Sequence, residues 1–323
     1  MQKVAVLGAG SWGTALALQL ARHNLKINLW GHLPEHIEQM KADGQNSVFL
    51  PGFPFPDNLQ PEQDLALCLK DADEVLIVVP SHAFASVIMA IKPYLKQQTS
   101  LSWATKGLDP ENNALLSNVC DSILGEREIA VISGPTFARE VASGLPTAIV
   151  VASRSPTHAK RLVSYLRDDN FRPYTSDDLI GVQVGGSAKN VMAIAAGISD
   201  GLGFGANSRA ALITRGLAEI GRLGAALGGH TETFMGLAGL GDLVITCTDD
   251  QSRNRRFGLA LANGLSIDEA RNSIGQEVEG ILTTKEIFVK ARSLGIEMPI
   301  TEQTYRVLYE NLPAAEILFS KVS

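Results

Sequence analysis

The stretch VAVLGAGSWG (residues 4–13) decides the fold, because it joins two kinds of pattern through a glycine-rich turn. Its first half, VAVLG, is an uninterrupted aliphatic run, which predicts a strand that is covered on both faces. Residues 12–23, at the end of the turn and beyond it, have the pattern of a helix. The stretch therefore predicts a strand, a tight turn and a helix in immediate succession, the first part of a βαβ unit.

The glycines of this turn, Gly8, Gly10 and Gly13, have the spacing G-x-G-x-x-G. In that spacing the first glycine makes the tight turn, the second lets a pyrophosphate approach the backbone, and the third lets the helix pack on the strand. The pyrophosphate then lies on the unpaired amides of the helix N-terminus, among them those of Ser11 and Trp12. We interpret the turn as a dinucleotide-binding site; the alternative is a glycine-rich turn with a structural role only.

The rest of the first half alternates aliphatic runs with helical patterns. The expected strands are VAVLG (4–8), INLW (27–30), VLIVV (75–79), TSLSW (99–103), IAVIS (129–133), TAIVVAS (147–153) and FRPYT (171–175). The expected helices are 12–23, 61–70, 82–92, 112–122 and 156–167. The Gly- and Pro-rich stretch 44–58 predicts an ordered loop. Strands that alternate with helices predict a mostly parallel sheet.

After residue 176 the strand patterns stop. Helices are expected at 177–200, 206–228, 254–263, 266–273, 279–294 and 299–309, with glycine-rich joints at 201–205 and 236–241. The fold class is therefore α/β: an N-terminal Rossmann-type, mostly parallel sheet with an all-α C-terminal domain. We expect residues 1–180 to form the dinucleotide-binding Rossmann domain and residues 181–323 the all-helical substrate and catalytic domain.

The charge of the chain limits its partners. Its 323 residues include 28 Lys and Arg and 34 Asp and Glu, which gives a formal net charge of −6 at pH 7. Such a chain lacks the basic footprint of a protein that binds nucleic acid or an anionic membrane. We therefore expect neither nucleic acid nor a membrane among its partners. Any anionic ligand must be held by local positive charge.

Cysteine and histidine usage bears on the compartment and on metal binding. The three cysteines, Cys68, Cys120 and Cys247, lie far apart without C-x-x-C spacing, which is typical of a reducing compartment. The six histidines form no H-x-x-H or H-E-x-x-H pair, so no metal site is expected. The chain opens directly on its first strand, and no apolar run has the length of a membrane span. These features predict a cytoplasmic protein without a signal peptide.

The second strand ends in LWGH, with His32 near the position where an NAD-specific enzyme usually carries an acid for the ribose hydroxyls. The absence of an acid permits a 2′-phosphate, so both NAD and NADP stay open as cofactors. His32 itself is either a phosphate contact or a surface histidine.

Polar residues follow the fourth and fifth expected strands, at the edge where an open α/β sheet binds its ligands. Lys106 in SWATKGL follows the fourth strand, and Gly134 and Thr136 in ISGPTFARE follow the fifth. Lys106 is a candidate ligand contact, the alternative being a surface lysine. Thr136 is expected to be the N-cap of the next helix. The free amides beyond it serve structure alone or face a cofactor.

Lys189 lies in GGSAKNVMAIAAGISDG (185–201), a segment that predicts a helix apolar on every face. Such a helix is normally buried, and an ammonium buried without a partner costs several kcal/mol. Burial lowers the pKa of a lysine toward the range in which it can shuttle a proton. We expect Asp242, in the glycine-rich turn of GLGDLVITC, to be its partner. The alternative is a lysine whose long stem reaches solvent from a partly exposed helix.

Two polar stretches stand at the starts of expected helices in the second half. Ser252, Arg253 and Asn254 lie where the helix of SRNRRFG begins. A helix N-terminus with a hydroxyl, a guanidinium and an amide suits a phosphate; the alternative is a solvated basic helix start. Glu277 and Glu279 in QEVEG precede the next helix, where carboxylates also suit the helix dipole.

These stretches together resemble the bacterial, NAD(P)-dependent sn-glycerol-3-phosphate dehydrogenases over nearly the whole chain. The resemblance rests on GAGSWGTALA, NSVFLPG, ATKGL, SGPTFARE, GGSAKNVMAIAAGISDGLGFGAN, GLGDLVITC and SRNRRFG, which occur in the family's order. It implies that Lys189 is the catalytic acid/base. In addition to the glycines of the turn, it implies cofactor contacts from Ser11, Trp12, His32, Lys106, Ala138, Arg253 and Glu279, with the choice between Glu277 and Glu279 open. It implies substrate contacts from Lys106, Gly134, Thr136, Lys189, Asp242, Ser252, Arg253 and Asn254.

The resemblance implies an oxidoreductase that interconverts dihydroxyacetone phosphate and sn-glycerol 3-phosphate with NADH or NADPH, supplying glycerol phosphate for phospholipid synthesis. Hydride transfer to the C2 carbonyl makes an alkoxide, which a nearby ammonium stabilises and protonates. A homodimer is expected from the family alone. Two alternatives remain: a reductase of the same architecture that acts on another small carbonyl compound, and a non-enzymatic NAD(P)H sensor.

Overall fold

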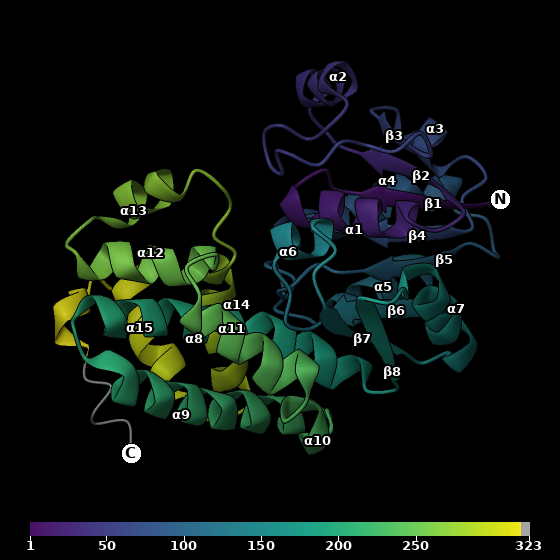
Figure 1. Cartoon of the computed structure of the whole chain (residues 1–323). Coiled ribbons are helices and arrows are strands. Elements are labelled where there is room, and N and C mark those ends of the chain that lie inside the picture. The colour runs from purple at the N-terminus through teal and green to yellow at the C-terminus, as the bar shows by residue number, and fades with distance from the viewer. Residues whose placement is uncertain (318–323) are drawn as a thin grey trace. The chain divides into compact units, whose positions relative to one another are not determined.

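In the computed structural model, which describes residues 1–317, eight strands form one sheet in the order β3-β2-β1-β4-β5-β6-β7-β8 (Figure 1). The strands are β1 (Gln2–Leu7), β2 (Leu25–Trp30), β3 (Leu59–Glu62), β4 (Glu74–Ile77), β5 (Ser100–Trp103), β6 (Ile129–Ser133), β7 (Thr147–Ser153) and β8 (Phe171–Ser176). The seven expected strands are confirmed, and β3 was not expected. It forms because Leu59 and Pro61 are buried against β2, and a proline is tolerated in an edge strand.

The order of the sheet reverses at β1, which pairs in parallel with β2 on one side and with β4 on the other. In open α/β sheets, ligands bind at the carboxyl ends of the strands that flank such a reversal. The glycine-rich turn follows the carboxyl end of β1. Sheet topology therefore places the turn where a dinucleotide site is expected.

Seven helices and a 3-10 turn connect these strands. They are α1 (Ser11–Ala21), α2 (Pro34–Asp43), α3 (Leu65–Leu69), α4 (Ser81–Ile91), η1 (Lys92–Tyr94), α5 (Leu116–Leu124), α6 (Ala138–Ala142) and α7 (Pro156–Leu166). Helix α1 packs against α6 and α7, and Phe84 of α4 meets Trp103 of β5 edge to face at 5.6 Å between ring centroids. Val4, Ala5, Val6 and Leu7 are all fully buried, as expected for an aliphatic strand covered on both faces.

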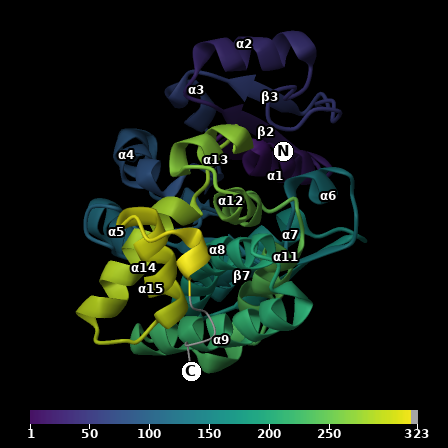
Figure 2. The same ribbon diagram turned by 90° about the vertical axis from the view of Figure 1, so that its left-hand side faces the viewer.

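The rest of the chain is helical. Its elements are α8 (Leu179–Gly201), α9 (Gly205–Ala226), α10 (Thr231–Phe234), η2 (Leu237–Gly241), α11 (Asp242–Thr248), α12 (Arg253–Ala262), α13 (Ile267–Ile274), α14 (Gly280–Ser293), α15 (Pro299–Tyr309) and η3 (Ala314–Glu316). Helices α14 and α15 pack side by side (Figure 2). A Cβ on Gly197 of α8 would lie 2.1 Å from the carbonyl oxygen of Arg255 on α12. Only glycine allows α8 and α12 to approach so closely.

Helix α8 forms much of the core of this helical part. It is long and apolar enough to cross a membrane by length and composition, contrary to the expectation from the sequence, but 94% of its most apolar window is buried inside the structure. Its residues Val191, Met192 and Ile194 are fully buried among the other helices. The apolar character of α8 is therefore explained by its place in a protein core.

By its internal contacts the chain divides into two units. The first comprises Met1–Thr105, Ser117–Ile132 and Thr136–Leu179, and the second comprises Lys106–Leu116, Ser133–Pro135 and Ile180–Ser323. Two short segments from the first half of the chain therefore belong to the helical unit. Residues 318–323 of the expected second domain lie outside the described part of the chain.

Three further differences from the expected elements concern short segments. The segment 61–70, expected to be one helix, consists of the last two residues of β3, a short connection and α3. Helix α2 was not expected, although Pro34 opens it and Gly44, at φ +62°, ends it in the left-handed conformation. The expected joint at 236–241 is the helical η2, and Asp242 is the first residue of α11 rather than part of a turn.

Candidate functional site

The glycine-rich turn has the geometry that its spacing predicts. Gly8 has φ +123° and donates its N–H to the carbonyl of Trp30 at 2.9 Å. A Cβ on Gly13 would lie 1.8 Å from the carbonyl oxygen of Gly8, whereas a Cβ on Gly10 would meet nothing within 4 Å. Helix α1 begins at Ser11 without a side-chain cap. The backbone of the turn is thus open beside Gly10, which fits a pyrophosphate on the first amides of α1.

Asn46 holds this turn and was missed in the sequence. It is fully buried, and its Nδ2 donates to the carbonyl of Ala9 at 2.9 Å and to Thr14 Oγ1 at 2.8 Å. Its Oδ1 accepts the N–H of Phe49 at 3.1 Å. The stretch 44–58 thereby supports the turn. In the sequence, Asn46 is part of the NSVFLPG motif, but the motif does not indicate which residues Asn46 contacts.

The turn yields a pair of matched variants. Gly13→Ala is expected to lower the free energy of unfolding by about 1–3 kcal/mol or more, because its methyl group meets backbone that must shift. Gly10→Ala is expected to change it by no more than about 0.5 kcal/mol, since Gly10 has φ −77° and open space. Urea unfolding measures both. Gly10→Ala should nevertheless weaken NADH binding, measured by fluorescence; unchanged affinity would mean that no pyrophosphate approaches Gly10.

The other predicted cofactor residues of the first unit lie on separate elements. His32 is exposed and follows β2, and Ala138 is the first residue of α6. The expectation that Thr136 caps this helix is wrong: α6 begins later, and its N-cap is Phe137. The contacts of these residues with a cofactor stay predictions.

In the second unit, Lys189 is buried and paired with Asp242, as expected. Lys189 is 6% exposed and Asp242 fully buried, which excludes a lysine that reaches solvent. Lys189 Nζ donates to Asp242 Oδ1 and, at 2.9 Å, to Thr246 Oγ1. Lys106 Nζ donates to the other carboxylate oxygen, Oδ2, at 2.6 Å. One carboxylate thus orients two ammonium groups.

Thr246 and the start of α11 complete this cluster. Asp242 and Thr246 lie one turn apart on the same face of α11, because residues four apart are neighbours on a helix. The Thr246 hydroxyl donates to the carbonyl of Asp242. Asp242 and Thr246 have this spacing in the sequence DLVIT. A helix predicted at this stretch would therefore have placed Thr246 beside Asp242.

The electrostatics of the cluster favour an anion and proton transfer. Burial lowers the pKa of Lys189 to about 8, with the nearby Lys106 ammonium acting in the same direction and Asp242 opposing both. Burial also raises the pKa of Glu279, against the attraction of Arg253 and Lys106. The two ammonium groups share a single carboxylate, so the cluster itself carries surplus positive charge in a chain of net charge −6.

The N-terminus of α12 has the expected arrangement. Ser252 is its N-cap and accepts the N–H of Arg255 at 3.2 Å, and Arg253 is its first residue. Asn254 donates from Nδ2 to Asn190 Oδ1 at 2.9 Å and accepts the N–H of Gly280 at 3.0 Å. Asn254 therefore ties α8, α12 and α14 together, and its contact with a substrate stays a prediction.

Asn190, beside Lys189, is a further residue that the sequence did not single out. Its Nδ2 is buried and has no hydrogen-bond partner within residues 1–317. A buried donor left in this state is costly and is available to a ligand.

The structure groups the predicted site residues by unit. The second unit contains Lys106, Gly134, Lys189, Asp242, Ser252, Arg253, Asn254, Glu277 and Glu279. The first unit contains Gly8, Gly10, Ser11, Trp12, Gly13, His32, Thr136 and Ala138. Glu277 is exposed, and Glu279 immediately precedes α14.

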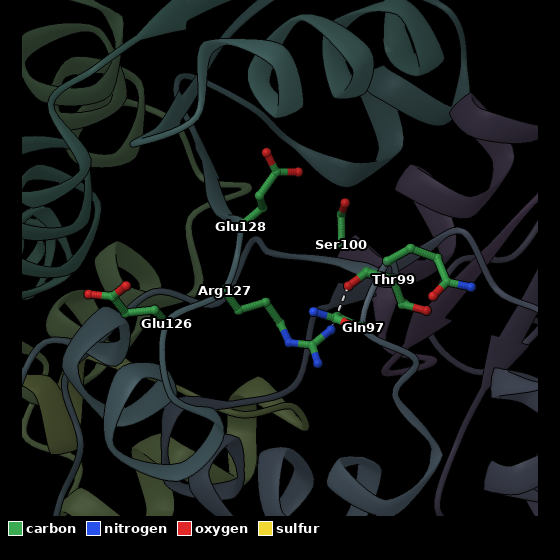
Figure 3. A pocket seen from close by; sticks show the side chains of 7 residues that line it. Gln97, Thr99, Ser100, Glu126, Arg127 and Glu128 are labelled. Atoms are coloured by element: carbon green, nitrogen blue, oxygen red, sulfur yellow. Dashed lines mark hydrogen bonds between the residues drawn. The ribbon is translucent and has the colours of Figure 1, made fainter.

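A pocket of about 300 Å³ lies elsewhere in the first unit, beside the amino ends of β5 and β6 (Figure 3). Arg127 donates across it to the carbonyl of Thr99 at 2.7 Å. Because the glycine-rich turn follows the carboxyl end of β1, and β1, β4, β5 and β6 are parallel, this pocket lies at the opposite edge of the sheet. It contains none of the predicted site residues.

Metal and disulfide chemistry have no visible support in residues 1–317. No group of three or more His, Cys, Asp or Glu side chains there is placed to hold a metal ion. The three cysteines are free and buried, and burial raises the pKa of Cys68 and of Cys247 to about 12. They are therefore held as thiols at neutral pH.

Comparisons with known proteins agree with this organisation. Residues 3–159 match the family model described as the NAD-dependent glycerol-3-phosphate dehydrogenase N-terminus, and residues 178–319 match the one described as its C-terminus. The chain is 55% identical over 323 residues to the glycerol-3-phosphate dehydrogenase (NAD(P)+) of Shewanella halifaxensis (strain HAW-EB4), covering 98% of this chain and 95% of that protein.

Two solved structures are similar over nearly the whole chain. The crystal structure of glycerol-3-phosphate dehydrogenase from Coxiella burnetii has a TM-score of 0.95 at 51% identity, covering 97% of this chain and 96% of that one. The glycerol-3-phosphate dehydrogenase of Saccharomyces cerevisiae has a TM-score of 0.84 at 28% identity, covering 97% of both chains. This chain therefore belongs to the family of NAD-dependent glycerol-3-phosphate dehydrogenases.

Proposed function

We propose that the chain catalyses the reversible reduction of dihydroxyacetone phosphate to sn-glycerol 3-phosphate with NADH or NADPH. The observation that carries this proposal is the buried Lys189–Asp242 pair, with the Lys106 ammonium on the same carboxylate. Family membership supports the substrate and the cofactor. The open backbone beside Gly10 fits the pyrophosphate of the dinucleotide.

In this mechanism Lys189 is the acid/base. The bound nicotinamide cofactor supplies the hydride in the direction of reduction. The Lys189 ammonium donates a proton to the C2 oxygen of the substrate and stabilises the charge that develops there. In the direction of oxidation, the neutral amine removes the proton from the C2 hydroxyl. Asp242 and Thr246 fix the position of the ammonium, and Asp242 offsets the loss of its hydration.

Arg253 and the N-terminus of α12 hold the substrate phosphate. The guanidinium forms charge-assisted hydrogen bonds to phosphate oxygens, and the amides and dipole of a helix start favour an anion. Ser252 fixes the start of the helix through its cap. Lys106 and Lys189 add positive charge to the same unit.

Arg253→Ala is expected to raise the KM for dihydroxyacetone phosphate by about ten- to a hundredfold, because the variant loses one hydrogen bond to the charged phosphate. The effect on kcat should be smaller, because the phosphate is not the reacting group. Arg256→Ala is the matched control, since Arg256 is exposed and lies on the same helix. Steady-state kinetics in both variants decide the matter; an unchanged KM for Arg253→Ala places the phosphate elsewhere.

A spectrophotometric assay tests the proposed function. The purified chain is mixed with dihydroxyacetone phosphate and, in parallel, NADH or NADPH, and the absorbance of the reduced nicotinamide is followed. Unphosphorylated dihydroxyacetone serves as the control. Oxidation that depends on the phosphate supports the proposal, and the two cofactors are ranked by their rates. If the chain binds NADH but does not oxidise it with dihydroxyacetone phosphate, the proposal is wrong. The chain would then be a reductase of another carbonyl compound or an NAD(P)H sensor.

We also propose a homodimer in the cytoplasm that supplies glycerol 3-phosphate for phospholipid synthesis. These points rest on the family alone. Light scattering tests the dimer, for which twice the chain mass of 34.5 kDa is expected.

A further inference from the structure

The segment that carries Lys106 is anchored to the helical unit, although it follows β5 in the chain. Residues Lys106–Leu116 belong to the second unit. Leu108 and Leu115 are 1% and 5% exposed and pack in the core of that unit. The position of Lys106 is therefore set by the helices that hold this segment.

Two side chains from different helices hold the backbone next to Lys106. Ser187 Oγ of α8 accepts the N–H of Gly107 at 2.8 Å. Glu286 Oε2 of α14 accepts the N–H of Leu108 at 3.1 Å. Gly107 has φ +136°, so the chain changes direction there. The amides of Gly107 and Leu108 are thus both held where the chain changes direction. This fixes the backbone next to Lys106, and with it the direction in which the Lys106 side chain points.

We propose that Glu286, together with Ser187, positions Lys106, keeping its ammonium on Asp242 in the catalytic cluster. Both are positioning residues, because they act through Lys106. The proposal rests on the proposed function, in which Lys106 contacts substrate and cofactor.

The environment of Glu286 supports a specific role for its carboxyl. Glu286 is 3% exposed, and its Oε1 has no hydrogen-bond partner within residues 1–317. The pKa of Glu286 is raised to about 7, chiefly by burial; the N–H of Leu108 opposes this rise, and the nearby Asp109 and Glu279 contribute to it. A buried carboxyl with one unpaired oxygen lowers the stability of the folded chain. An apolar side chain at this position of the helix would be less destabilising. Within residues 1–317, the bond from the N–H of Leu108 is the one hydrogen bond of this carboxyl.

Glu219 provides a matched control in the same unit. It is 1% exposed and accepts the N–H groups of Ile300 and Thr301 at 2.6 and 3.2 Å. Burial also raises the pKa of Glu219. Its partners lie at the start of α15, with no bond to the Lys106 segment, so its role is to join α9 to α15.

The experiment compares four variants of the full chain. Glu286→Met fills the volume but removes the acceptor, Glu286→Gln keeps an oxygen acceptor, Ser187→Ala removes the second acceptor, and Glu219→Met is the control. The kcat/KM for dihydroxyacetone phosphate should fall at least about tenfold in Glu286→Met, since small misplacements of a catalytic group carry large effects. Glu286→Gln should stay within about threefold of the wild type, and Glu219→Met should keep its kcat/KM whatever its stability.

Amide hydrogen exchange supplies a readout that needs no turnover. The peptide covering residues 104–116 should exchange faster in Glu286→Met and in Ser187→Ala than in the wild type and in Glu219→Met. If the wild type does not turn over dihydroxyacetone phosphate, the proposed function fails, and the exchange data still decide whether Glu286 holds the segment. If Glu286→Met does not fold, Ser187→Ala must show the same two effects. Exchange and kinetics that match those of Glu219→Met overturn the proposal.

Discussion

Replacing Lys189 by alanine is expected to lower kcat for dihydroxyacetone phosphate reduction by about three orders of magnitude, while the affinity for NADH stays near that of the wild type. The variant loses both the proton donor and the charge that stabilises the developing alkoxide. The dinucleotide turn lies in the other unit of the chain. Steady-state kinetics measure the loss of turnover, and fluorescence titration measures the retained NADH affinity.

Lys285→Ala is the matched control for this variant, because Lys285 is an exposed lysine of α14. Its kinetics should equal those of the wild type. Small primary amines added to Lys189→Ala should restore part of the activity, because the deleted side chain leaves room for a proton donor. Turnover of Lys189→Ala within tenfold of the wild type would remove Lys189 from the chemistry.

Asp242→Asn is expected to have the second largest effect, on stability as well as on activity. It leaves the Lys189 ammonium buried without its counter-charge, which costs about 3–5 kcal/mol of unfolding free energy at neutral pH. Turnover should fall about a hundredfold or more, because both ammonium groups of the cluster lose the carboxylate that orients them. Urea unfolding and steady-state kinetics measure the two effects.

The stability deficit of Asp242→Asn should depend on pH in a defined direction. Without the carboxylate the pKa of Lys189 falls below the value of about 8 that it has in the wild type, while the unfolded chain still binds that proton. Stability rises with pH wherever the unfolded state binds more protons, so the deficit should shrink as the pH is raised toward 8. Asp268→Asn is the control, because Asp268 forms an exposed pair with Arg271. A deficit that is independent of pH would contradict this assignment.

Much of the fold was readable from the sequence because its signals are local. The aliphatic run of β1 and the glycine spacing predict a strand, a turn and a helix within a few residues of one another. Lys189 stood out because it is a charge in the middle of an apolar helix, whereas Asp200 lies at the end of that helix. The burial of Lys189 and its partner Asp242 are confirmed. In each case the residues that carry the signal are neighbours in the chain.

The features that were missed depend on contacts distant in sequence. In the sequence Asn46 is an ordinary loop asparagine, and only the folded chain places it against Ala9 and Thr14. The role of Glu286 can be inferred only from the folded chain, in which the segment of Lys106 donates a hydrogen bond to this residue of α14. Periodicity and spacing carry no information on such pairings.

The pH dependence of kcat/KM in both directions of the reaction tests the role of Lys189 most directly. Reduction requires the ammonium and oxidation requires the neutral amine, and burial lowers the pKa of Lys189 to about 8. The proposed mechanism predicts mirror-image profiles: reduction falls above about pH 8, and oxidation rises through the same pH. Profiles with the same direction in both reactions, or no change between about pH 6 and 10, would contradict it.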